Sequence, residues 1–241
     1  MFVYLFSSFL EESKNYGKIN FRKRERENME VENKGILCVG LLFIAILVLL
    51  TSGCGVNEMK SGTLEGYSYE EVEEKSNYVK LVTNDDKVIL MELYPDVAPI
   101  TVANFQKLVS EKFYDGLIFH RVIEGFMIQT GDPTGTGSGG SEEKIKGEFL
   151  RNGVENTLKH EKGVLSMART SVDNDSASSQ FFIMVSDDHP YLDGDYAAFG
   201  RVIAGYEVVE EISLVKTDSN DKPYHPQKIR TIRFVSVEKQ E

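Results

Sequence analysis

The stretch that decides the fold is FHRVIEGFMIQTGDPTGTGSGG, at residues 119–140. Its first half contains two candidate β-strands, which end at Val122 and Thr130. The Gly-rich run 131–140 includes a GxGxxG spacing, but no helix follows it and it lacks the Gly-Lys-Ser/Thr of a phosphate-binding loop. We therefore interpret this run as a surface loop and not as a nucleotide site.

Polar side chains interrupt the apolar pattern here and further along the chain. Arg121, Gln129 and Gln180 are set among large apolar residues, namely Phe126, Met127, Phe181, Phe182 and Leu192. Because buried polar groups need hydrogen-bonding partners, an apolar surface that carries an arginine and two glutamines indicates a pocket for a peptide. A purely structural role would leave these three polar groups unexplained.

The remainder of residues 77–238 predicts a mainly β domain. Pro99 is expected to begin a helix at its first position, where a missing N–H costs nothing. A second short helix is expected near 206–214. Further short strands are expected at 78–83, 87–94, 117–122, 126–130, 163–168, 180–185, 198–202 and 229–237. Many short strands with only two helices indicate an antiparallel barrel or sandwich.

Composition limits the other chemistries. Two cysteines and four scattered histidines offer little to a metal, and no G-x-S-x-G motif accompanies the serines. We interpret His120, His189 and His225 as structural. The net charge of −11 argues against a nucleic-acid binder, which needs a basic face.

Four blocks of sequence together resemble the cyclophilin family of peptidyl-prolyl cis-trans isomerases. They are residues 119–140, GVLSMAR at 163–169, SASSQFFIMV at 176–185 and YLDGDYAAFGRV at 191–202. The resemblance covers nearly the whole domain. It implies a closed eight-stranded antiparallel β-barrel capped by two α-helices, with an active groove on its outer face and no metal or cofactor. The implied activity is isomerisation of X–Pro bonds in proline-containing polypeptides, which assists protein folding.

The resemblance also implies the site residues. Arg121 matches the catalytic arginine of the F-H-R motif, and Gln129 matches the glutamine of F-M-x-Q, which would hold the substrate backbone. The implied substrate-binding positions are Phe126, Met127, Ala168, Gln180, Phe182, Tyr191, Leu192 and Tyr196.

Three residues of these blocks depart from the family's best-known members. Tyr191 and Tyr196 stand where many eukaryotic members have Trp and His, and Arg169 stands where Asn is frequent. The alternative function is a catalytically weak proline-peptide-binding module or holdase. Arg121 and Gln129 argue against that alternative, because a binder has no need of a transition-state donor.

Residues 1–53 are interpreted as a signal peptide region. The uncharged run 35–50 would span about 24 Å as a helix, less than the roughly 30 Å hydrocarbon core of a bilayer. Ser52-Gly53 before Cys54 resembles a bacterial lipobox, in which Cys54 is lipidated and becomes the mature N-terminus. An uncleaved signal anchor and ordinary cleavage are the alternatives. Met29 offers a second translation start, which would give a shorter segment before the apolar run.

Residues 54–76 are polar and acidic without sustained periodicity, so we expect a lipidated Cys54 followed by a flexible tether. The isomerase domain then occupies residues 77–238. The expected product is a monomeric, palmitate-bearing lipoprotein of the bacterial cell membrane that faces the extracytoplasmic side. Its acidic domain would be repelled by anionic head groups, so its attachment would come from the acyl chains.

Overall fold

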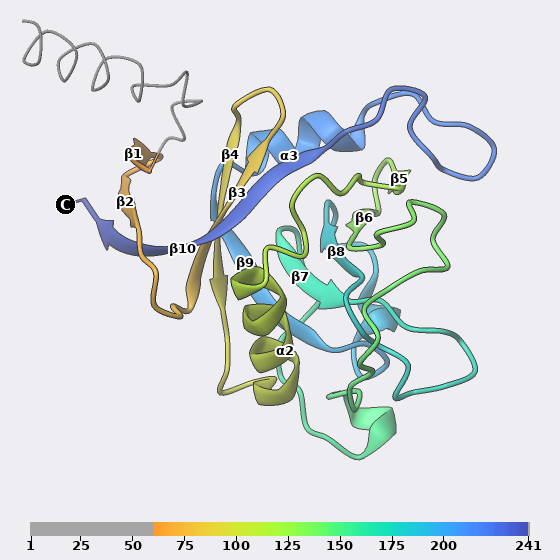
Figure 1. Ribbon diagram of the computed structural model, residues 1–241. Helices are drawn as coiled ribbons and strands as arrows, with labels where there is room; N and C mark the ends of the chain where they lie inside the picture. Colours follow the sequence, from red (N-terminus) through yellow and green to blue (C-terminus); the bar gives the residue numbers. More distant parts are fainter. Residues whose placement is uncertain (1–59, 241) are drawn as a thin grey trace, which may run out of the picture. The chain divides into compact units, whose positions relative to one another are not determined.

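The computed structural model describes residues 60–240 (Figure 1). The predicted signal region, Met29, Cys54 and the first part of the predicted tether lie outside the described residues. Within 60–240, no helix combines the length and the apolar character that crossing a membrane requires.

Ten strands form one sheet, in the order β1-β2-β10-β3-β4-β9-β7-β8-β6-β5, and every neighbouring pair is antiparallel. The strands are β1 (Ser61–Leu64), β2 (Tyr67–Glu71), β3 (Tyr78–Thr83), β4 (Val88–Leu93), β5 (Arg121–Ile123), β6 (Met127–Thr130), β7 (Val164–Met167), β8 (Phe181–Met184), β9 (Ala198–Ala204) and β10 (Ile229–Lys239). The helices are α2 (Pro99–Ser110) and α3 (Tyr206–Ser213), with 3₁₀ turns η1 (Leu150–Asn152) and η2 (Pro190–Leu192). The mainly β fold with two helices is thus confirmed.

The predicted closed barrel of eight strands needs correction, because the sheet has ten strands and its end strands β1 and β5 do not pair. Of the strand expected at 117–122, only the part from Arg121 onward belongs to β5, which is three residues long. The segment 116–122 meets the loop before β10 through separate hydrogen bonds, such as those from Phe119 N to Gln227 O (2.9 Å) and from Val122 N to Asp221 O (2.8 Å). Because β5 is short and its neighbour here is a loop, the two segments form separate hydrogen bonds and no continuous β-ladder.

A hairpin also replaces much of the predicted flexible tether. β1 and β2 are joined by a turn at Glu65 and Gly66, whose φ values are 46° and 82°, and β2 pairs with the last part of β10. Tyr69 packs on the outer face of the sheet in one apolar cluster with Leu90 and Val235. Because this packing compensates the entropy of ordering the segment, the hairpin belongs to the folded domain.

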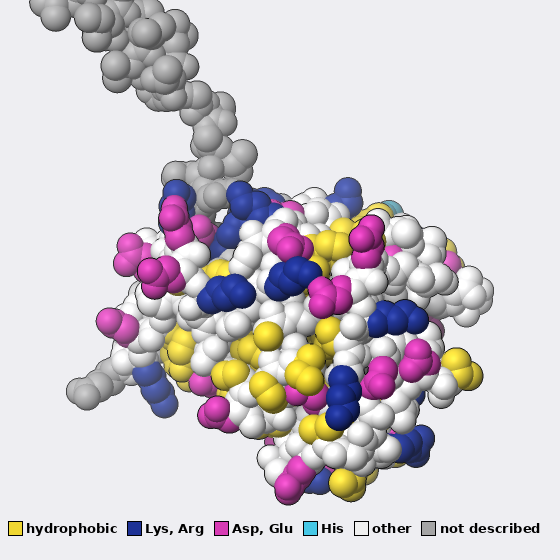
Figure 2. All heavy atoms as spheres, turned by 60° about the horizontal axis from the view of Figure 1, so that its bottom comes forward, with side chains coloured by type: hydrophobic (Ala, Val, Ile, Leu, Met, Phe, Trp, Pro, Cys, Tyr) yellow, Lys and Arg dark blue, Asp and Glu magenta, His cyan; other side chains and the backbone are white. Residues whose placement is uncertain are grey.

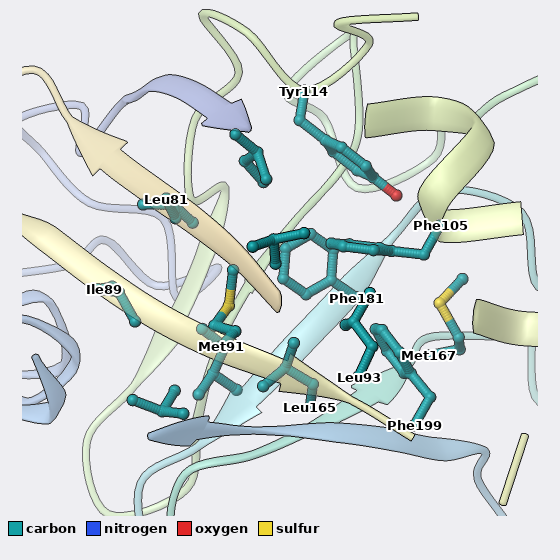
Figure 3. Close-up of a cluster of buried hydrophobic side chains, with 14 of the residues drawn as sticks. Leu81, Ile89, Met91, Leu93, Phe105, Tyr114, Leu165, Met167, Phe181 and Phe199 are labelled. Carbon is teal, nitrogen blue, oxygen red and sulfur yellow. The ribbon is translucent and has the colours of Figure 1, made fainter. Parts of the chain in front are cut away.

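The main core lies between the inner face of the sheet and α2 (Figure 3). The ring of Phe105 on α2 meets Phe181 and Phe199 at centroid distances of 5.3 Å each. The helix begins at Pro99, as predicted. Ala98 cannot cap it with a side chain, and the carboxylate of Glu148 instead accepts hydrogen bonds from the amides at 100 and 101, at 3.0 and 2.7 Å.

Candidate active site

An apolar floor lies on the outer face of β6, β7 and β8. Strand alternation separates it from the main core, since Ile128 points inward whereas its neighbour Met127 points outward. The buried members of the floor are Met127, Val164, Phe182, Met184, Leu192 and Ala198, and half-buried Ile123, Phe126, Leu158, Ala168 and Tyr196 pack against them. The structure thus brings together most of the apolar residues that the sequence predicted for substrate binding.

A row of polar side chains borders this floor. Arg121 on β5 is the register partner of Gln129 on β6, which in turn lies opposite Phe182 on β8. Gln129 Nε2 donates to Gln180 Oε1 at 2.8 Å, and Gln180 Nε2 donates to the carbonyl oxygens of Gly137 (3.0 Å) and Gly139 (2.6 Å). The Gly-rich loop therefore fixes Gln180, and Gln180 fixes Gln129.

Arg121 is held from the other side by a residue that the sequence analysis missed. Its Nε donates to Asp221 Oδ2 at 3.4 Å, and both side chains are 43% exposed. Asp221 has a φ of 63°, in the left-handed region, and its carbonyl accepts the amide of Val122. Since the two residues are 100 positions apart, no local motif could have indicated the pair.

Asp132 organises the Gly-rich loop from beneath. Its carboxylate is buried and accepts hydrogen bonds from the amides of Thr134 (2.7 Å), Thr136 (3.0 Å) and Gly137 (2.6 Å). Burial opposes the charge, but hydrogen bonds from Thr134, Gly139 and Gly137 outweigh burial and lower the pKa of Asp132 to about 2. The loop is thus built around a carboxylate that is negatively charged at neutral pH.

Aromatic residues form one rim of the floor. His189 Nε2 donates to Gly125 O at 2.9 Å, so its Nδ1 accepts from the hydroxyl of Tyr191 at 3.1 Å. Its ring lies 4.5 Å from that of Phe126. Tyr191 is 63% exposed and stands at the rim, whereas Tyr196 packs edge-on against Phe182 at 6.0 Å and belongs to the floor. The sequence analysis interpreted His189 as structural and did not predict that its ring lies beside Phe126 at the rim of the floor.

His120 is buried beneath the Gly-rich loop, and burial lowers the pKa of its ring. Neither ring nitrogen has a hydrogen-bond partner among the described residues. Burial therefore favours a neutral ring at this position. Within residues 60–240, no group of three or more His, Cys, Asp or Glu side chains is arranged to hold a metal ion.

An outward-facing apolar floor bordered by an arginine and two linked glutamines defines a site for a peptide that lies across a sheet. The family model for cyclophilin type peptidyl-prolyl cis-trans isomerase/CLD matches residues 78–234. The chain belongs to the cyclophilin family, and its activity is that of a peptidyl-prolyl cis-trans isomerase.

Relatives of known sequence and structure agree with this assignment. Peptidyl-prolyl cis-trans isomerase ppi1 of Schizosaccharomyces pombe is 47% identical over 152 residues, which cover 63% of this chain and 94% of that protein. Peptidyl-prolyl cis-trans isomerase-like 1 of Aspergillus niger is 46% identical over 146 residues, covering 60% and 87% respectively. Such relatives consist of little beyond the matched region. In this chain, residues 59–241 form one compact unit. We therefore treat residues 59–241 as a folding unit of their own.

A solved structure also resembles the domain. The cyclophilin type peptidyl-prolyl cis-trans isomerase of Cryptosporidium parvum, determined in the presence of the dipeptide Ala-Pro, has a TM-score of 0.59 and 35% identity. The match covers 65% of this chain and 97% of that one.

Proposed function

We propose that the floor and polar row accelerate rotation about X–Pro bonds of exported or envelope polypeptides, on the extracytoplasmic side of a bacterial membrane to which Cys54 anchors the protein. The observation that carries the catalytic part is the register pair of Arg121 and Gln129 beside the outward side chains of Met127 and Phe182. A charged donor and an amide thus stand at the edge of an apolar surface suited to a proline ring.

The chemistry needs no covalent step. Amide resonance sets a rotation barrier of ~18–20 kcal/mol, and uncatalysed X–Pro isomerisation takes roughly 10–100 s. In the twisted amide the prolyl nitrogen becomes pyramidal and gains a lone pair. The guanidinium of Arg121 donates a hydrogen bond to that lone pair and stays charged at physiological pH. Because the interaction exists only in the transition state, it raises the rate.

The other residues bind and orient the substrate. Phe126, Met127, Phe182 and Leu192 hold the proline ring, with Tyr196 behind Phe182 and Tyr191 on the rim. Gln129 bonds to the neighbouring peptide group, and Gln180 keeps Gln129 in place. Ala168, whose amide donates to Gln180 O at 3.0 Å, has a side chain small enough to let the substrate backbone approach.

Asp221 is expected to act as a positioning residue for Arg121. The Asp221→Asn variant should lower kcat about two- to fivefold, because an ion pair of this exposure contributes up to ~1 kcal/mol. KM for an X–Pro peptide should change little, since the pair does not touch the apolar floor. The control Glu124→Gln removes a carboxylate from the adjacent turn without removing an ion pair of Arg121. Equal kcat values for both variants would contradict this role.

The position of β1 is compatible with an anchor. β1 and β5 are the two ends of the strand order, so the chain enters the domain at the sheet edge that lies away from Arg121 (Figure 1). The described residues nearest in sequence to the predicted anchor are therefore at the other end of the strand order from Arg121.

The anchor itself is tested by replacing Cys54. In a bacterial host, Cys54→Ala should abolish labelling by radioactive palmitate and move the protein from the membrane fraction to the soluble extracytoplasmic fraction. Cys38→Ala is the matched control, because Cys38 lies within the predicted signal region and is not the acceptor. A Cys54→Ala protein that stays in the membrane would favour the uncleaved signal anchor and contradict the lipoprotein proposal.

A further inference from the structure

A cavity of about 490 Å³ adjoins the polar row. We infer that it binds an acidic side chain of the substrate, on a residue that flanks the proline, an inference that rests on the proposed function of the floor. Gln129, Ala168 and Gln180 line both the cavity and the edge of the floor. A substrate strand on the floor therefore has a neighbouring residue within reach of the cavity, because extended chain advances roughly 3.3 Å per residue.

The charges around this cavity have one sign. Among the described residues that line it, Lys144 and Arg169 are the only charged ones, and the others are small or hydroxyl-bearing residues or the two glutamines. The chain as a whole carries a net charge of −11, and acidic and basic side chains are interspersed on the face in Figure 2. A cavity whose charged lining residues are all cations differs from this mixed surface and suits a carboxylate.

Arg169 is already positioned for such a ligand. Its Nε donates to Asp195 O and its Nη1 to Thr170 O, at 2.9 Å each, and its guanidinium lies 4.8 Å from the centroid of the Tyr196 ring. Both acceptors are backbone carbonyls, and within residues 60–240 no carboxylate oxygen lies within 4.0 Å of this guanidinium. Its charge is therefore unneutralised, and three of its five N–H groups remain for a bound carboxylate.

The carboxylates nearest the cavity compete only weakly. The side chain of Asp195 pairs with Arg151 at 2.7 Å, and only its backbone oxygen accepts a hydrogen bond from Arg169. Asp173 Oδ2 lies 4.0 Å from Lys144 Nζ, and both side chains are more than half exposed. Since solvent screens such a pair, a substrate carboxylate held between Lys144 and Arg169 can displace it.

The test uses residues 60–241 and pairs of peptides that differ only by Glu or Gln, placed in turn at each of three positions before and after an X–Pro bond. Exchange NMR gives kcat/KM for each peptide at low and high ionic strength. We expect Glu to exceed Gln about three- to tenfold at one position, and we expect salt to reduce that advantage. In Arg169→Gln the ratio should fall to about one, and in Lys144→Gln it should fall in part.

The matched control is Lys162→Gln, which removes one positive charge that pairs with Glu210 and does not line the cavity. It should keep the wild-type ratio. Turnover of neutral peptides with no advantage for Glu at any position would overturn the acidic pocket and leave the proposed function intact. If no peptide turned over, the proposed function would fail, and binding titrations with the same Glu and Gln pairs would decide the pocket separately.

Thermal unfolding of each variant shows whether a change in the Glu-to-Gln ratio comes from loss of the folded structure. The salt dependence is measured on the wild type and does not depend on the folding of any variant.

Discussion

Replacing Arg121 with alanine should lower kcat for an X–Pro peptide by about 10²–10³-fold, the usual loss when one transition-state donor is removed. The guanidinium is needed only when the prolyl nitrogen becomes pyramidal, so kcat should fall while KM stays nearly constant. The fold should persist, because Arg121 is 43% exposed and its ion pair with Asp221 contributes little to stability.

The Arg121→Lys variant sharpens this experiment. Lysine keeps the positive charge but replaces the planar fork by a point charge on a flexible stem, so its turnover should lie between those of the wild type and Arg121→Ala. Exchange NMR on residues 60–241 gives the rates, and circular dichroism confirms that each variant is folded. Turnover near the wild-type level in a folded Arg121→Ala protein would remove Arg121 from the mechanism and return attention to the holdase alternative.

What the sequence could predict depended on local pattern. Pro99 predicted the start of α2, because a proline ring is tolerated in the first turn of a helix but not in its interior. The strand expected at 126–130 is present as β6, and along it Ile128 packs in the main core whereas Met127 packs in the floor, since side chains alternate along a strand. The apolar floor and the two glutamines therefore followed from short stretches of chain.

What the sequence could not predict depended on contacts between distant segments. Asp221 reaches Arg121 only because the loop before β10 is folded back onto β5. Tyr69 is ordered by Leu90 and Val235, which lie on strands far along the chain, so its segment looked like a tether in isolation. Tyr191 and Tyr196 are chemically alike, yet Tyr191 is exposed in the turn η2 (Pro190–Leu192) whereas Tyr196 packs against Phe182 in the floor.

A buried charge at the base of the Gly-rich loop should produce the second large effect. The Asp132→Asn variant should be less stable than the wild type by about 2 kcal/mol at pH 7, because the ionised carboxylate accepts several hydrogen bonds that the neutral amide satisfies less well. It should also turn over X–Pro peptides more slowly, since the carbonyls of Gly137 and Gly139 hold Gln180 in place.

The sign of the pH dependence separates this explanation from a general packing defect. The folded-state pKa of Asp132 is about 2, below the unfolded value near 4, so its ionisation stabilises the protein above pH 4 and that stabilisation is lost as the pH falls towards 2. Urea unfolding followed by circular dichroism should therefore show the wild type and Asp132→Asn converging over this range. The control Asp218→Asn alters a carboxylate that caps the 218–222 turn from a more exposed position, so it should have a smaller effect. A stability difference for Asp132→Asn that stayed constant from pH 7 to pH 2 would show that the carboxylate charge is not what holds the loop.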